Sequence, residues 1–275
     1  MIFDILTLFP AMFAAPMGQS ILGKAQARGL VEVRVHNIRD YATDKHQMTD
    51  DRPFGGGEGM VMKPEPLVSA IESLQQETPR PWVVLLTPQG RLFSQAIAWE
   101  LSHKTRVLFI CGRYEGVDER VAEYYTDDQI SIGDYVLTGG ELAAMVLTDA
   151  VARLIPGVLG NEASTATESF NEPILEHPQY TRPRDFRGQG IPEILLSGNH
   201  EAIESWRRGQ ALYRTRQRRP DLFAKLILSR RDEELLRRAE EENEIHSRKS
   251  VPTDDQENGF ALCRIGALSG SESQR

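Results

Sequence analysis

The sequence has few cysteines and no long apolar run. Its 275 residues include only two cysteines, Cys111 at the end of an apolar run and Cys263 in a polar tail. A disulfide framework is therefore not expected. We expect a reducing, cytoplasmic environment instead. No segment approaches the roughly 18 apolar residues that a membrane helix needs. We expect neither a signal peptide nor a membrane span.

Several cofactor and metal motifs are also missing. The sequence contains no G-x-G-x-x-G, so a nicotinamide or flavin site of the Rossmann type has no local support. It contains no H-E-x-x-H and no paired C-x-x-C, which argues against zinc held by the protein. Gly18–Ala25 resembles a P-loop, but Ala25 stands where the magnesium-binding serine or threonine belongs, and no strand directly precedes it.

Acidic residues outnumber basic ones. With 32 Lys and Arg against 40 Asp and Glu, the net charge is −8. This excludes a protein that coats nucleic acid indiscriminately, but it leaves room for a local basic patch. A composition of 40% hydrophobic and 26% charged residues is that of a globular protein. The length allows one large domain or two ordinary ones.

Three apolar runs stop at glycine-containing turns. Val107–Cys111 and Gln129–Ile132 each end directly at a glycine, and Trp82–Leu86 leads into the turn sequence TPQG. Short runs bounded in this way are typical of buried strands. Backbone amides are free to face a ligand where such strands end, and glycine allows close approach. The pattern therefore predicts a small-molecule site at these three turns.

Strand-like and helix-like segments alternate in the first half of the chain, which predicts an α/β layer with a mostly parallel sheet. The polar, glycine-rich segment Asp44–Met62 is expected to be a long loop, and loops of this length in compact domains are usually functional or disordered. The expected strands are Phe3–Phe9, Val31–Ile38, Trp82–Leu86, Val107–Cys111 and Gln129–Ile132, and the expected helices are Gln19–Arg28, Leu67–Leu74 (after Pro64), Ser94–Ser102, Val117–Tyr125 and Glu141–Leu154.

Periodicity vanishes between Asn161 and Arg187, which predicts a linker. Three helices are expected after it, at Glu201–Arg216, Asp221–Leu228 and Asp232–Ile245. The polar tail that follows is expected to be disordered. The predicted organisation is an α/β domain (1–160), a linker (161–187), a helical domain (188–246) and a tail (247–275).

Six arginines and two aromatic residues crowd into one short stretch without an acidic residue among them. A solvated helix face is one interpretation. The other is phosphate contact with stacking on unpaired bases, for which arginine and aromatic side chains are suited. We favour RNA over duplex DNA because no recognition-helix pattern is evident. The residues are Arg207, Arg208, Arg214, Arg216, Arg218 and Arg219, with Trp206 and Tyr213.

Three further features each allow a structural and a functional interpretation. The glycine cluster Gly55–Gly59 is either a flexible loop tip or a loop that folds over a ligand. Arg153, at the end of an apolar helix, either pairs with the helix C-terminus or faces a pocket. Phe170, alone in a polar linker, suggests docking onto another surface.

Taken together, the motifs resemble a known family. The segments GGGEGM, TPQG, CGRYEGVDER, SIGDYVLTGGE, RLIPGVLGNEAS, HPQYTRP, LLSGNH and RRPDL occur in a consistent order. They are similar to the bacterial tRNA (guanine-N1)-methyltransferases, the TrmD family of the SPOUT superfamily, over roughly Met1 to Leu228. The resemblance implies a parallel sheet with a deep trefoil knot that holds S-adenosylmethionine, which general topology rules would not predict. A small all-helical C-terminal domain would follow.

The resemblance also implies partners and a reaction. Members of the family act as homodimers, with each active site shared between the two chains. They methylate N1 of the guanine immediately 3′ of the tRNA anticodon (position 37), and they depend on magnesium. The expected partners are therefore the tRNA anticodon stem-loop and a second copy of the chain. Since the sequence offers no dedicated magnesium cage, any Mg²⁺ would be held by a few carboxylates and waters.

The family motifs assign roles to residues of this sequence. The family's base lies in a D-S-F motif that here reads Glu168-Ser169-Phe170, so Glu168 is the expected base for the N1 proton and Arg153 the expected stabiliser of O6. The expected cofactor-binding residues are Leu86, Thr87, Pro88, Gly112, Glu115, Ile132, Gly133, Asp134, Tyr135, Val136, Leu137 and Gly140. The expected substrate-binding residues are Gly59, Ser197, Asn199, His200, Arg207, Arg214, Arg218 and Arg219.

Two positions depart from the family pattern. Glu168 stands in place of aspartate, and displacements of about 1 Å can cost on the order of 100-fold in rate. Glu58 stands in the glycine loop, where an uncharged small residue or proline is expected. Two alternatives follow: a related SPOUT enzyme that acts on another RNA, and a catalytically silent RNA-binding module that has lost its base. We expect the linker around Glu168 to become ordered only when tRNA is bound.

Overall fold

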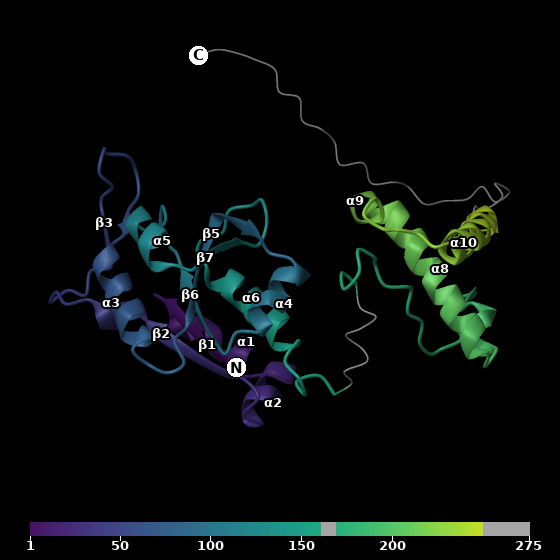
Figure 1. The fold of residues 1–275 in the computed structure, drawn as a ribbon, viewed down its shortest axis with the longest axis horizontal. Helices are drawn as coiled ribbons and strands as arrows, with labels where there is room; N and C mark the ends of the chain where they lie inside the picture. The colour runs from purple at the N-terminus through teal and green to yellow at the C-terminus, as the bar shows by residue number, and fades with distance from the viewer. Residues whose placement is uncertain (161–168, 250–275) are drawn as a thin grey trace, which may run out of the picture. The chain divides into compact units, whose positions relative to one another are not determined.

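The computed structural model describes residues 1–160 and 169–249. The chain divides into two compact units, Met1–Glu176 and His177–Arg275. The first unit is built around a five-stranded sheet with the strand order β2-β1-β6-β5-β7 (Figure 1). Every pairing in this sheet is parallel. The predicted α/β class with a parallel sheet is confirmed.

Helices cover both faces of this sheet, and an apolar layer separates each set of helices from the strands. Strands buried on both faces are near-continuous apolar runs, and every residue of β6 is buried accordingly. The strands are β1 (Ile2–Thr7), β2 (Glu32–Asn37), β5 (Trp82–Leu92), β6 (Arg106–Cys111) and β7 (Asp128–Ser131). All but β5 lie within two residues of the predicted bounds.

The predicted end of β5 at Leu86 is wrong. The strand continues to Leu92, and its pairing with β7 shifts from Leu86–Ile130 to Arg91–Ile130. The TPQG segment is therefore an outward excursion within one strand. An added Cβ on Gly90 would collide with the backbone of Ile130. The chain can thus rejoin β7 because this residue has no side chain.

The five helices predicted for the first unit are present and begin within three residues of their predicted starts, whereas three four-residue elements, Pro10–Phe13, Ala14–Met17 and Ile38–Tyr41, were not predicted. Ser94 caps the helix after β5, accepting a hydrogen bond of 3.5 Å from the Ile97 amide. One face of the sheet carries η1 (Pro10–Phe13), α1 (Ala14–Met17), α2 (Ser20–Ala27), α4 (Gln95–Ser102) and α6 (Glu141–Ala152). The other face carries η2 (Ile38–Tyr41), α3 (Pro64–Gln75) and α5 (Glu119–Tyr125).

The segment expected to be one long loop is partly ordered as a ladder. β3 (Asp50–Asp51) and β4 (Val61–Met62) pair antiparallel and close the glycine-rich residues between them. The Met62 side chain is fully buried against the second apolar layer. This contact fixes one end of the glycine loop to the sheet.

The second unit contains two long helices that pack closely. An added Cβ on Gly209 would lie 2.8 Å from the Leu235 carbonyl oxygen, so the absence of a side chain permits the close approach. A short hairpin precedes the helices. The elements are β8 (Asp185–Phe186), β9 (Gln189–Gly190), η3 (Glu193–Leu196), α8 (His200–Arg218), α9 (Pro220–Phe223) and α10 (Arg230–Lys249).

Two of the three helices predicted for this unit are present with longer bounds, and one is largely wrong. Asp221–Leu228 was expected to be helical, but α9 ends at Phe223. Ile227, a few residues beyond it, is almost fully exposed and buries no apolar surface. A helix gains most of its stability by burying an apolar face, which explains why this one stops early.

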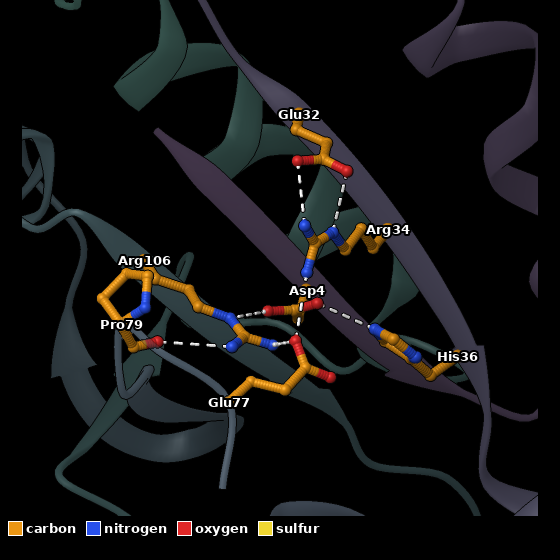
Figure 2. A network of polar contacts seen from close by, with 7 residues as sticks. All are labelled: Asp4, Glu32, Arg34, His36, Glu77, Pro79 and Arg106. Carbon is orange, nitrogen blue, oxygen red and sulfur yellow. Dashed lines mark hydrogen bonds and ion pairs between the residues drawn. The ribbon is translucent and has the colours of Figure 1, made fainter. Parts of the chain in front are cut away.

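A charged cluster lies on the sheet where β6 begins (Figure 2). Asp4 is 0% and Arg106 is 1% exposed, and Arg106 Nε lies 2.5 Å from Asp4 Oδ2. The other carboxylate oxygen lies 2.8 Å from His36 Nε2. Arg106 also donates to the Pro79 carbonyl at 3.3 Å and pairs with Glu77 at 3.1 Å. Burial raises the pKa of Asp4. Hydrogen bonds from His36 and Arg106 lower this pKa by more than burial raises it, so the net shift is downward.

We expect Asp4→Asn to lower the free energy of unfolding by about 3–5 kcal/mol at pH 7, because it leaves the buried Arg106 with only the half-exposed Glu77 as a counter-charge. Since the folded-state pKa of Asp4 is depressed, this stabilisation is complete above the unfolded-state pKa. It disappears as the pH falls through the folded-state value. Urea denaturation at pH 7 and at low pH measures both effects. Glu32→Gln, at the solvent-exposed rim of the cluster, is the control, and equal losses in the two variants would contradict the prediction.

Candidate functional site

A cavity of about 420 Å³ opens at the carboxyl ends of the central strands. Most of its lining comes from the TPQG excursion of β5 and from the segments that follow β6 and β7. Ligands of open parallel sheets bind at this edge, and the volume lies in the range of small-molecule pockets. The three segments that the sequence singled out therefore meet around one cavity.

The cavity gathers nearly all the residues expected to bind a cofactor. Asp134 is the exception, since it does not contribute to the lining. The residues that do are Leu86, Thr87, Pro88, Gly112, Glu115, Ile132, Gly133, Tyr135, Val136, Leu137 and Gly140.

Backbone contacts shape the segment after β7. Gly140 donates a hydrogen bond of 3.0 Å to the Gly112 carbonyl, which joins this segment to the end of β6. The Tyr135 hydroxyl donates to the Ile132 carbonyl at 3.2 Å, so its ring folds back over Gly133. The exposed ring of Tyr135 and the exposed side chain of Val136 then give the cavity an apolar wall.

The glycine loop contacts a residue of the cavity lining, Glu115. The Glu115 amide donates a hydrogen bond of 2.9 Å to the Met60 carbonyl. Gly59 has φ +87°, and an added Cβ would lie 2.5 Å from the Glu115 side chain. No other residue type fits this conformation and this approach. The two interpretations therefore hold for different parts of the loop: Gly59 packs against a residue of the cavity lining, whereas residues 55–57 form an exposed tip.

Sequence reasoning missed a buried acid beneath the cavity. Glu141 opens α6 and is in contact with both Thr7, at the end of β1, and Arg113, just past β6. The only signal in the sequence is an acidic residue that directly follows Gly139-Gly140 and precedes an apolar helix. That pattern is common at helix starts, so it does not reveal burial.

Of the two expected catalytic residues, only Arg153 lies in the part of the chain that the structure describes. Arg153 is the half-buried C-cap of α6, and its amide donates to the Asp149 carbonyl at 3.3 Å. Glu168 lies outside the described residues. The segment just after it is anchored to the first unit, since Trp99 Nε1 of α4 donates to Asn171 Oδ1 at 3.4 Å. Phe170, expected to dock, is about half exposed.

Acidic residues neutralise much of the arginine-rich stretch. The sequence showed no acid among these arginines, but in the fold they pair with acids of α8 itself, of α9 and of α10. The resulting ion pairs are Arg207–Glu204 at 2.5 Å, Arg208–Asp232 at 2.9 Å, Arg216–Glu240 at 2.6 Å and Arg219–Asp221 at 2.6 Å. The local surplus of positive charge is thus smaller than the sequence indicates.

Arg214 and Arg218 lie one turn apart in α8, in a different setting. Burial lowers the pKa of Arg214, and the positive charge of Arg218 lowers it further. The same helix carries Trp206, whose ring lies 6.4 Å from that of Tyr180. Two arginines that repel each other favour an anion between them, and the exposed ring of Tyr180 beside the partly buried Trp206 suits base stacking.

The remaining predicted substrate residues lie at the other end of α8. Ser197 Oγ accepts from the Asn199 amide at 3.1 Å, and Asn199 Oδ1 accepts from the Ala202 amide at 3.1 Å. These bonds cap the helix that His200 begins. At 1.5 Å per residue, roughly 20 Å of helix separates this cap from Arg214. The structure therefore does not bring the two groups together.

The part of the chain that the structure describes shows neither a metal-binding cluster nor a membrane-spanning helix. Within it, no group of three or more His, Cys, Asp or Glu side chains is arranged to hold a metal ion. No helix among these residues is long and apolar enough to span a bilayer.

The fold and the cavity define an α/β protein with a small-molecule site at the carboxyl edge of a parallel sheet. The family model described as tRNA (Guanine-1)-methyltransferase TrmD matches residues 1–225. A tRNA (guanine-N(1)-)-methyltransferase of Geotalea uraniireducens is 58% identical over 234 residues, which cover 85% of this chain and 95% of the relative. The chain therefore belongs to the TrmD family of tRNA (guanine-N1)-methyltransferases, as the motifs predicted.

Two other relatives carry the same name and cover a similar share of the chain. A protein of the same name from Anaeromyxobacter sp. (strain K) is 58% identical over 241 residues, covering 87% of this chain and 97% of the relative. A protein of the same name from Geobacter sulfurreducens is 55% identical over 242 residues, which cover 88% of this chain and 99% of the relative. The similarity thus extends past the end of the family model and into the last helical part of the chain.

Proposed function

We propose that this protein transfers a methyl group from S-adenosylmethionine to N1 of the guanine immediately 3′ of the tRNA anticodon. Family membership supports the tRNA guanine as substrate. The observation that supports S-adenosylmethionine as the methyl donor is the cavity, because eleven of the twelve residues expected to bind it line this cavity. The position of the guanine in tRNA rests on the family resemblance.

The residues around the cavity fit such a donor. Leu86, Tyr135 and Val136 offer apolar surface for a flat base, and the backbone groups of the surrounding turns can bond its edge. The Glu115 carboxylate lines the cavity and offers a negative partner to a cationic ligand. When bound, S-adenosylmethionine supplies a methyl group activated on a sulfonium.

The chain's own residues would handle the proton and the charge. Guanine N1 carries a proton with a pKa well above neutral, so methylation needs a carboxylate within hydrogen-bond reach. The family motif gives this role to Glu168. As the proton leaves, negative charge builds on O6, and the Arg153 guanidinium would stabilise it. The guanine must leave its stack to reach this site.

We expect Glu168→Gln to lower methyl transfer by about 10²- to 10⁴-fold, the usual contribution of a positioned base. The assay follows labelled methyl groups from S-adenosylmethionine into tRNA transcripts with guanine or adenine 3′ of the anticodon. Glu172→Gln, a nearby carboxylate of the same segment, is the matched control. Repeating the assay with a chelator tests the expected need for Mg²⁺.

Each outcome of this assay selects one interpretation. Transfer to the guanine transcript alone, lost in Glu168→Gln but not in Glu172→Gln, supports the proposal. Full activity of Glu168→Gln would show that Glu168 is not the base, and Asp134 and Glu176 would then be the candidates. No transfer by wild type would favour the silent RNA-binding module, and transfer to a different RNA would favour a related SPOUT enzyme. An active enzyme of this kind would work in the cytoplasm with its tRNA.

We infer that the sheet is knotted, as the family implies. After the edge strand β7 the chain returns past β5 to β6, where Arg113 forms a bridge with Gly139. An added Cβ on Gly140 would lie 2.7 Å from Cys111 Cα, so the returning segment is tightly enclosed. These contacts support a threaded arrangement, which an experimental structure traced through residues 130–145 would test.

We assign RNA contact in the second unit to the surface formed by Arg214, Arg218, Tyr180 and Trp206. Arg214→Ala and Arg218→Ala are each expected to weaken tRNA binding at every ionic strength. Each should also reduce the salt-dependence slope by about 1, because each removes one phosphate contact. Arg216→Ala is the matched control, since Arg216 already pairs with Glu240 at 2.6 Å. Fluorescence titration at several salt concentrations measures the slopes. Equal effects of all three variants would contradict the assignment.

We also propose that the protein is a homodimer. α6 exposes Leu142 (50%) and Val146 (46%) one turn apart, and the partly exposed Met12 lies on the neighbouring η1. Val146→Glu should shift the protein from dimer to monomer in sedimentation velocity without unfolding it, because a charge there disfavours an apolar interface. Tyr124→Glu, on the exposed face of α5, should leave the mass unchanged. A wild-type monomer would refute the proposal.

A further inference from the structure

A buried ion pair lies beneath the cavity. Glu141, the first residue of α6, is 1% exposed. Its carboxylate accepts hydrogen bonds of 2.8 Å from Thr7 Oγ1 and 3.2 Å from Arg113 Nε, and its Oε2 lies 3.0 Å from Arg113 Nη2. Withdrawing a carboxylate from water is unfavourable unless charged and polar partners surround it. Arg113, Thr7 and the N-terminus of α6 supply such partners, with Oε2 held by the ion pair to Arg113 and not by a hydrogen bond.

Arg113 connects this pair to the wall of the cavity. Its Nη1 donates to the Thr138 carbonyl at 3.1 Å, and its guanidinium lies over the Phe9 ring at 4.3 Å from the centroid. Arg113, Thr138 and Gly139 all line the cavity, whereas Glu141 is not part of the lining. Glu141 can therefore influence a bound ligand only indirectly, and Arg113 is the lining side chain with which it pairs.

The segment that passes over the ion pair is built to fit it. An added Cβ on Gly139 would collide with Arg113 Nε and lie 2.5 Å from Glu141 Oε2. The chain thus comes into direct contact with both charged groups at this point. A shift of the guanidinium would be passed on to the Thr138 carbonyl and to the neighbouring residues of the cavity wall, because close packing leaves little space to absorb it.

We propose that Glu141 is a positioning residue for cofactor binding. It fixes the orientation of Arg113, and Arg113 holds the segment from Gly133 to Gly140 in the conformation that accepts S-adenosylmethionine. The inference rests on the proposed function for the identity of this ligand. It adds a residue that does not touch the ligand and that nevertheless sets its affinity.

The test removes the negative charge of the Glu141 side chain and keeps the size of that side chain. Glu141→Gln still accepts a hydrogen bond from Thr7 but no longer pairs with Arg113. Calorimetric titration without RNA, with S-adenosylmethionine and separately with S-adenosylhomocysteine, should give Kd values raised by about 10- to 100-fold, the range for one charged hydrogen bond. In turnover assays KM for S-adenosylmethionine should rise similarly, while KM for tRNA stays unchanged.

Two further variants separate positioning from general destabilisation. Asp4→Asn also disrupts a buried ion pair, but one outside the cavity lining, so its Kd should equal that of wild type below its unfolding temperature. The double variant Arg113→Gln/Glu141→Gln should bind no more weakly than Arg113→Gln alone, because both changes remove the same interaction.

Three results would overturn the inference: a wild-type Kd in Glu141→Gln, equal weakening in Asp4→Asn, or additive losses in the double variant. A wild-type protein that binds neither ligand would refute the proposed function itself, and the inference would fall with it. The two failures are distinguishable, because the first appears only in the variants and the second already in wild type.

Discussion

The return of the chain from β7 to β6 is the constraint on which the site depends. The hydrogen bond from Gly140 to the Gly112 carbonyl and the bridge between Arg113 and Gly139 hold that return in place. Without it, the segment after β7 would leave the sheet at its edge and the cavity would lack one wall. The cavity is thus a product of chain topology, and its floor is formed by residues that are distant in sequence.

Two buried ion pairs stand at the two ends of β6. Arg106 opens the strand and pairs with Asp4, and Arg113 follows its end and pairs with Glu141. The first pair lies outside the cavity lining and is best understood as a feature of the fold. The second adjoins the cavity wall. Burial makes both sensitive to the loss of one partner, so comparing them separates a fold defect from a binding defect.

The helical unit uses its charges in two ways. α10 contributes Asp232 and Glu240, which pair with arginines of α8 and hold the two helices together. Arg214 and Arg218 instead repel each other beside an aromatic pair. Surface ion pairs contribute little stability each, but they decide which arginines are available to an incoming phosphate. An acidic chain can in this way keep a small basic surface.

The parallel sheet, the helix starts and the three glycine-bounded segments could be predicted because each depends on local pattern. Apolar runs, caps and turn residues act over a few positions, so the chain alone reveals them. The motifs likewise revealed the family. Other features depend on which distant residues meet, and here prediction failed: the length of β5 depends on contact with β7, and the short α9 on the lack of burial at Ile227 beyond it.

By itself, therefore, the sequence determined the fold class, the family and eleven of the residues that line the cavity. Only the tertiary structure decided that Glu141 is buried against Arg113, that Asp134 is not part of the lining, and that acids of α10 neutralise Arg208 and Arg216. The physical reason is that burial and charge pairing are properties of neighbours in space, and the neighbours that matter here are brought together only when the chain has folded.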